Sequence, residues 1–186
     1  MIKLIERVDN ELIKKNIMPM VTCIATWVVA ILFLFRNMEM GIATMSTFIL
    51  MTIQLISSIN DLYNRTIPIN LMIFALALGL LICGIFYKTN ALINCILGGI
   101  AAFAVMKLLI MISKRQVGGG DLALMTVTGF FAGINSFFSI LFISIVLAGL
   151  YSLFLVFTKK GNKETEIPFA PFVLLGTVLL ALGGIW

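Results

Sequence analysis

Residues 121–157 read DLALMTVTGFFAGINSFFSILFISIVLAGLYSLFLVF, and only the first of them is charged. A helix needs roughly 17–25 mostly apolar residues to cross a bilayer core about 30 Å thick, at about 1.5 Å of rise per residue. This stretch is therefore long enough for two crossings. The cluster Gly133-Ile134-Asn135-Ser136 divides it, because such residues are typical of turns. We predict two spanning helices, over residues 121–134 and 136–157.

The rest of the 186-residue chain has the same apolar character. It is 61% hydrophobic and 11% charged, whereas soluble domains carry about 25% charged residues. A soluble fold of this size could not bury so many apolar side chains, so we expect the lipid bilayer to be a partner. Further apolar runs cover residues 18–35, 41–60, 67–87, 91–112 and 168–186. The predicted fold class is all-α, a polytopic membrane protein with about seven transmembrane helices, or six as the alternative.

Residues 1–17 differ from the predicted transmembrane domain, which covers residues 18–186. Their apolar residues recur at helical spacing with charged residues between them. This pattern predicts an amphipathic helix on the inner membrane face. The alternative is a solvated helical leader to the first span. A cleavable signal peptide is not expected, because the hydrophobic run begins late and no small-x-small cleavage site follows it.

The basic residues predict the orientation of the spans. With seven spans and a cytoplasmic N-terminus, ten of the 13 lysines and arginines lie in inner segments, and only Arg36 and Lys88 lie outside. Lys107 falls within the fourth span, near its inner end, where its side chain can extend toward the headgroups. This bias agrees with the positive-inside rule. The net charge of +5 thus reflects topology, and no nucleic acid partner is expected.

Several classes of chemistry lack their residues. The chain contains no histidine, which excludes a Ser-His-Asp triad, an HExxH zinc site and a Ser-His dyad. Cys23, Cys83 and Cys95 fall inside predicted spans without CxxC spacing, so we interpret them as small apolar residues of helix packing. We expect neither a metal site nor an organic cofactor.

Two of the eight acidic residues differ from the others in position. Six lie in the leader or in predicted loops, whereas Asp61 and Asp121 fall at the inner ends of the second and fifth predicted spans. The topology therefore brings both carboxylates to one membrane face at one depth. A carboxylate beside the bilayer is costly to ionise and to desolvate, so each is a candidate functional residue.

Two neighbouring carboxyl groups can act as an aspartic-protease dyad. They do not both ionise easily, so one keeps its proton while the other can take a proton from water. The neutral carboxyl can then donate a hydrogen bond to the scissile carbonyl, without metal or cofactor. Gly118, Gly119 and Gly120 precede Asp121, and as glycines they can adopt positive φ and let a substrate strand approach closely.

Each of these residues also has a local structural interpretation. Asp121 could be only a helix N-cap, and Asp61 could be a loop acid paired with Arg65. Pro68 and Pro168 are expected in the first turns of the third and last spans, where proline is tolerated. The functional alternative is that the Pro68 and Pro168 segments help to wall the active site.

Three segments together resemble the type IV prepilin peptidases of the GxGD aspartyl protease group. The first is Asp61-Leu-Tyr-Asn-Arg-Thr-Ile67-Pro68, which is similar to the first catalytic Asp followed by Ile-Pro. The second is Gly118-Gly119-Gly120-Asp121, which is similar to the GxGD box with the second catalytic Asp. The third is Ile167-Pro168-Phe169-Ala170-Pro171-Phe172, which is similar to a late Ile-Pro motif ahead of the last span.

The resemblance implies a peptidase of a bacterial cytoplasmic membrane that cleaves a prepilin or pseudopilin at the cytoplasmic face. The bond would follow a short, basic leader and precede a hydrophobic helix. Larger members that also methylate the trimmed N-terminus carry paired CxxC motifs, which are absent here, so a peptidase-only form is expected. The alternatives are a proton-coupled transporter and a non-catalytic scaffold of a pilus or secretion machine. The sequence does not indicate an oligomeric state.

Overall fold

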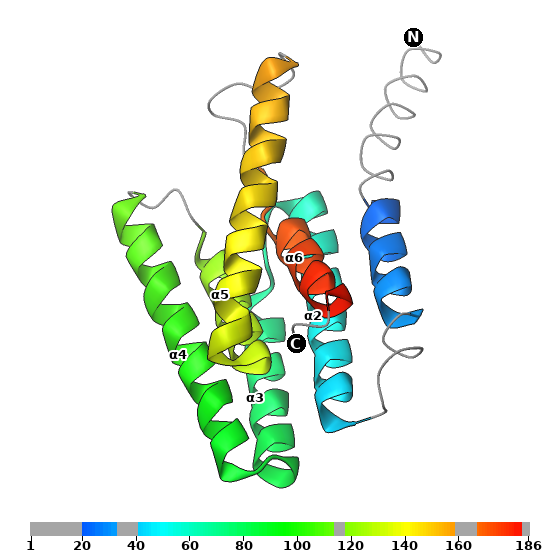
Figure 1. The fold of residues 1–186 in the computed structure, drawn as a ribbon. Helices are drawn as coiled ribbons and strands as arrows, with labels where there is room; N and C mark the ends of the chain where they lie inside the picture. The colour runs from blue at the N-terminus through cyan, green and yellow to red at the C-terminus, as the bar shows by residue number, and fades with distance from the viewer. Residues whose placement is uncertain (1–19, 33–40, 114–117, 159–166, 184–186) are drawn as a thin grey trace.

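The computed structural model describes residues 20–32, 41–113, 118–158 and 167–183. Within these ranges every regular element is a helix, which confirms the all-α prediction. The helices are Met20–Leu32, α2 (Ile42–Asn64), α3 (Ile69–Phe86), α4 (Thr89–Ile112), α5 (Gly119–Phe157) and α6 (Ala170–Leu182) (Figure 1). The predicted amphipathic helix over residues 1–17 lies outside the described residues.

Four of these helices are long and apolar enough to cross a membrane. They are α2, which qualifies from Ala43, and α3, α4 and α5, while Met20–Leu32 and α6 are shorter apolar helices. Large apolar side chains on the outside, such as Ile85 and Phe142 at 70% exposure each, are suited to contact with lipid tails. A multi-pass membrane protein is therefore supported, while the number of seven spans stays a prediction.

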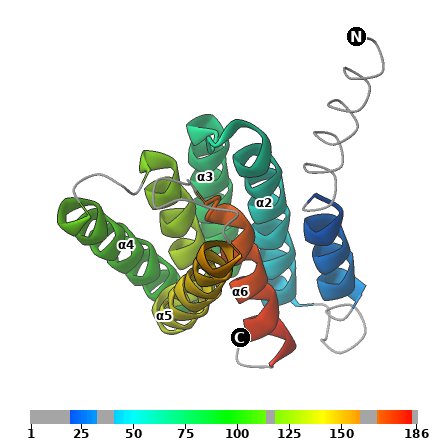
Figure 2. The same cartoon turned by 90° about the horizontal axis from the view of Figure 1, so that it is seen from above.

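Helix α5 consists of two arms that meet at Gly133. Gly133 has φ 74° and ψ 173°, which is not helical, although helix continues on both sides of it. The Asn94 side chain of α4 accepts a hydrogen bond from the backbone N–H of Ile134 at 3.3 Å. Asp121 and Ile145, on opposite sides of Gly133 in the sequence, line the same cavity, and the two arms lie side by side (Figures 1 and 2). The predicted division at residues 133–136 is confirmed.

Glycines let α4 and the first arm of α5 approach closely. A Cβ atom added to Gly98 would lie 2.2 Å from the carbonyl oxygen of Gly129, and one added to Gly129 would lie 2.5 Å from the Cβ of Ala102. Gly79 of α3 likewise contacts the Phe130 and Phe131 rings. Glycine thus permits close helix packing at these positions, as it commonly does in membrane helices.

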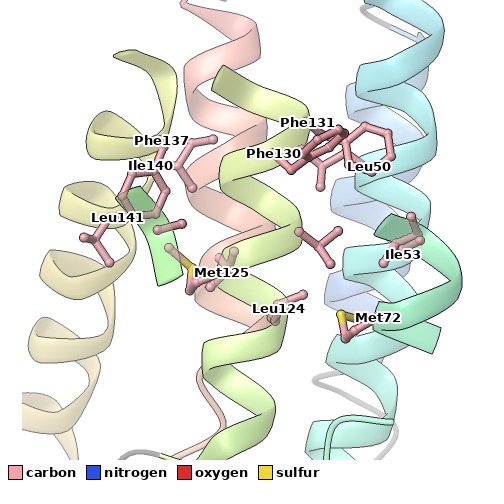
Figure 3. Packing of buried hydrophobic residues seen from close by; sticks show 14 of the residues in the cluster. Leu50, Ile53, Met72, Leu124, Met125, Phe130, Phe131, Phe137, Ile140 and Leu141 are labelled. Carbon is pink, nitrogen blue, oxygen red and sulfur yellow. The ribbon is translucent and has the colours of Figure 1, made fainter. Parts of the chain in front are cut away.

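The main apolar cluster joins α2, α3 and both arms of α5 (Figure 3). Leu50 of α2, Leu124 of the first α5 arm and Phe137 of the second arm are fully buried in it. A second cluster joins α2, α6 and the helix Met20–Leu32 through residues such as Met51, Leu174 and Cys23. Because both clusters include α2, they hold α2, α5 and α6 in one bundle. The candidate functional residues lie at one end of this bundle.

Candidate active site

Asp61 lies in the last turn of α2 and is nearly buried, with 7% of its surface exposed. Its Oδ2 accepts a hydrogen bond of 3.0 Å from the backbone N–H of Ala170, the first residue of α6. The predicted second span ended at residue 60, whereas α2 continues to Asn64. Because the helix includes Asp61, the carboxylate projects into the bundle and contacts α6.

Arg65 ends α2 and turns the chain toward Ile67 and Pro68. It adopts a left-handed conformation with φ 53°, and its backbone N–H donates to the Asp61 carbonyl oxygen at 3.1 Å. The pairing of Asp61 with Arg65 stays a prediction. Asp61 is not simply a loop acid, because it lies within α2 and accepts the buried bond from Ala170.

The glycine segment before α5 packs against the segment that follows α2. A Cβ atom added to Gly120 would lie 2.8 Å from the Cβ of Ile67, whereas one added to Gly119 would meet nothing within 4 Å. Gly120 thus allows a close approach by Ile67 of the same chain, and the approach of a substrate strand stays a prediction. Residues 118–120 do not use the positive φ that glycine permits, because among the described residues only Arg65 and Gly133 have positive φ. Gly118 has φ −71°, since the helix begins directly after it.

Asp121 occupies the first turn of α5 and is partly exposed. Its Oδ2 accepts the backbone N–H of Gly118 at 3.3 Å, a local bond of the kind that helix starts favour. The side chain also lines a cavity of about 230 Å³. The remaining lining residues come from α4, the second α5 arm and the segment before α6: Met106, Leu109, Leu141, Ile145, Ile167 and Phe169. Asp121 is therefore a helix-start residue with access to a largely apolar cavity.

The two acidic side chains lie at the same end of the bundle. The late segment connects them, because Ala170 binds Asp61 while Phe169 lines the Asp121 cavity. All three segments that the sequence singled out therefore meet here.

The two predicted prolines lie beside this site in different settings. Pro68 is the N-cap of α3 and not part of its first turn. Pro168 precedes α6, whose N-cap is Phe169, so the expectation that Pro168 opens the last helix is wrong, and Pro171 is the proline of the first turn. Pro168 lines a second, apolar cavity of about 190 Å³, together with Leu62, the neighbour of Asp61.

Two features of the site were missed by sequence reasoning. The Ala170 donor is a backbone group and leaves no trace in residue identity. Gln54, a buried amide on α2, could have been noticed as the one glutamine within a predicted span. Within the described part of the chain, no three potential ligands cluster in a way that could hold a metal ion.

Comparison with known proteins identifies the family. The profile of the type IV leader peptidase family matches residues 48–153, which include Asp61 and Asp121. The chain belongs to this family. A curated relative, the prepilin leader peptidase/N-methyltransferase of Bacillus subtilis (strain 168), is 28% identical over 162 residues. The match covers 86% of this chain but only 65% of the length of that relative. No solved structure matched the chain.

Proposed function

We propose that this member of the type IV leader peptidase family is an aspartic endopeptidase that uses Asp61, Asp121 and water. The observation that carries the proposal is that residues 167–170 contact both acids: Ile167 and Phe169 line the Asp121 cavity, and the Ala170 N–H donates to Asp61. Few other reactive side chains exist in this apolar chain. A peptide placed in the Asp121 cavity would lie beside Phe169, the sequence neighbour of the Ala170 N–H that binds Asp61.

The chemistry follows from one shared proton. The ionised carboxylate takes a proton from water as the water oxygen bonds to the scissile carbonyl carbon, and the neutral carboxyl donates a hydrogen bond to the carbonyl oxygen. The carbon–nitrogen bond then breaks, and the departing amine receives a proton from the carboxyl group that had accepted one. Water is consumed and no redox partner is needed. The apolar walls of the cavity, such as Leu141 and Phe169, would limit access of bulk water.

The proposed substrate is a prepilin or pseudopilin with a short basic leader ahead of a hydrophobic helix. The name of the Bacillus relative includes prepilin leader peptidase, which supports this class. The basic residues favour a cytoplasmic N-terminus, so the site would face the cytoplasm from the cytoplasmic membrane. The substrate helix would remain in lipid while the leader is released.

The proposal covers the peptidase activity alone. The name of the relative also includes an N-methyltransferase. The CxxC pairs that the family resemblance associates with methylation are absent from this sequence. We therefore propose no methyl transfer by these 186 residues.

The deciding experiment compares Asp61→Asn and Asp121→Asn with the parent protein, purified and reconstituted in lipid nanodiscs. The substrate is a prepilin peptide that includes its apolar segment, and mass spectrometry detects the cleaved leader. Each substitution should abolish cleavage while circular dichroism stays helical. Glu39→Gln, which removes a carboxylate from a predicted outer loop, serves as the matched control and should cleave normally. Cleavage by either Asp variant would exclude that residue from the dyad, and an inactive parent would contradict the proposed activity.

A further inference from the structure

A buried amide connects the three helices that carry the site. Gln54 of α2 has no exposed surface, and its Nε2 donates to the Thr128 Oγ1 at 3.1 Å and to the Thr177 Oγ1 at 2.9 Å. Thr128 belongs to the first arm of α5, and Thr177 belongs to α6. The same three helices supply Asp61, Asp121 and the Ala170 N–H.

The spacing along each helix is the same. Gln54 precedes Asp61 by seven residues on α2. Thr128 follows Asp121 by seven residues, and Thr177 follows Ala170 by seven. Seven residues form about two helical turns, or roughly 10 Å, and return to the same helix face. The Gln54 contacts therefore form one layer of the bundle, two turns from the site on every helix.

The hydrogen bonds in this layer define the amide orientation. The Thr128 hydroxyl donates to the Leu124 carbonyl at 2.9 Å, and the Thr177 hydroxyl donates to the Val173 carbonyl at 3.0 Å. Both hydroxyls therefore accept from Gln54, whose two N–H groups are used. The Oε1 of Gln54 is buried and receives no hydrogen bond from the described residues.

An unsatisfied acceptor in a dry core costs free energy. Replacing such a polar group by an apolar group of the same shape is often neutral or stabilising. Stability alone thus gives no reason for glutamine here. Geometry gives a reason, because the two N–H groups of Gln54 can reach both threonine hydroxyls only when α5 and α6 have one axial alignment.

We infer that Gln54 is a positioning residue that sets the register of α2, α5 and α6, so that Asp61 and Asp121 meet at the correct height. This inference rests on the proposed peptidase function. Gln54 touches neither carboxylate, and it acts through the helices that carry them. Loss of its two hydrogen bonds should misalign the site while the apolar packing keeps the bundle folded.

The first test is Gln54→Met, which has similar length and leaves both threonine hydroxyls bonded to their own helices. We expect kcat to fall roughly 10- to 100-fold, as small misalignments of catalytic groups do. KM should change little, and the melting temperature should stay equal or rise. Ser144→Ala is the matched control: Ser144 is fully buried at the α5–α6 contact, and among the described residues it bonds only to its own helix, at the Ile140 carbonyl.

A companion pair tests the hydroxyl partner. Thr128→Val removes the acceptor and leaves a buried N–H of Gln54 without a hydrogen-bond partner, so both the melting temperature and kcat should fall. Thr128→Ser keeps the hydroxyl and should restore kcat toward that of the parent. If Thr128 acted through packing alone, Thr128→Val would have the higher kcat and Thr128→Ser the lower one, because valine keeps both branches of the threonine side chain.

A distance measurement does not depend on activity. Spin labels are attached at Tyr63→Cys, an exposed site on α2, and at Gly119→Cys, an open site at the start of α5. The distance between the two labels reports how far the end of α2 that carries Asp61 lies from the start of α5 that carries Asp121. The three native cysteines are replaced by alanine. Double electron–electron resonance should give one narrow distribution of label distances in the protein that keeps Gln54, and a broader or shifted distribution in the Gln54→Met variant.

Normal kcat and an unchanged distance in Gln54→Met would overturn the inference. A joint fall of melting temperature and kcat at an unchanged distance would also overturn it, because that result describes a purely structural residue. If the parent protein cleaved no prepilin peptide, the proposed function would fail. The distance measurement would then decide the positioning role by itself.

Discussion

Gly120→Ala should inactivate the proposed peptidase through a contact of a single methyl group. A Cβ atom at Gly120 would lie 2.8 Å from the Cβ of Ile67. Carbon atoms pack at about 3.5–4.0 Å, so one of the two segments must move by about 1 Å. Gly120 directly precedes Asp121, and the movement therefore displaces the carboxylate.

The size of the effect follows from that displacement. A misplacement of about 1 Å can lower a rate roughly 100-fold, which corresponds to about 3 kcal/mol of activation free energy. Because Gly120 lies at the start of α5 and is not one of the buried residues of the main apolar cluster, the fold should persist. The expected result is a low kcat in a protein whose helix content and melting temperature are near those of the parent.

The assay uses the reconstituted protein and a prepilin peptide with its apolar segment, and it measures kcat and KM by quantitative mass spectrometry. Gly119→Ala is the matched control, because the same methyl group there meets nothing within 4 Å. Ile67→Gly removes the clashing Cβ and leaves the Ile67 backbone atoms at 3.4 and 3.5 Å from the Gly120→Ala methyl, which is an ordinary contact. The double variant should therefore be more active than Gly120→Ala alone.

Equal activity of Gly120→Ala and the parent protein would refute the reasoning, since the contact would then have no consequence for Asp121. Equal impairment of Gly119→Ala and Gly120→Ala would refute it as well. That outcome would mean that flexibility of the glycine segment matters, and not the space between Gly120 and Ile67. Failure of Ile67→Gly to improve Gly120→Ala would assign the defect to another contact.

Three further predictions concern packing, helix proximity and the range of activity. Gly129→Ala should lower stability by about 1–3 kcal/mol, because its methyl would lie 2.5 Å from the Cβ of Ala102; an unchanged melting temperature would contradict this. Copper-phenanthroline should join Cys83 and Cys95, whose sulfur atoms lie 3.8 Å apart, and mass spectrometry should find the same link in Cys23→Ser. Absence of the link would argue against the α3–α4 contact. Cleaved substrate should acquire no label from S-adenosylmethionine, and methylation of its new N-terminus would contradict the proposal that these residues transfer no methyl group.

The helices were predictable because lipid imposes a simple rule on sequence. A run of apolar residues between polar residues defines a span, so the predicted range 67–87 became Ile69–Phe86 and the range 91–112 became Thr89–Ile112. The division of residues 121–157 was also visible, because Gly133 tolerates the positive φ that the turn requires. Asp61 was placed at a helix end, and the error was only that α2 continues through it.

The contacts that make the site were not predictable from one sequence. The partner of Asp61 is a backbone N–H at residue 170, and residue identity carries no record of that choice. The glycines before Asp121 suggested backbone freedom, but Gly120 serves by lacking a Cβ atom beside Ile67. Gln54 reaches across to residues 128 and 177, and such long-range pairings depend on how the helices pack.

The buried polar side chains of α2 divide into two kinds, and the division explains how an apolar bundle acquires one register. Ser57 and Ser58 donate to carbonyls of their own helix, so they are satisfied whatever helix lies beside them. Gln54 and Asp61 find their partners on other helices, so their burial is costly unless α5 and α6 stand at one height. The bonds of Gln54 and Asp61 form at one register of these helices. The groups that we propose for catalysis and its alignment are therefore among those that define the arrangement of the helices.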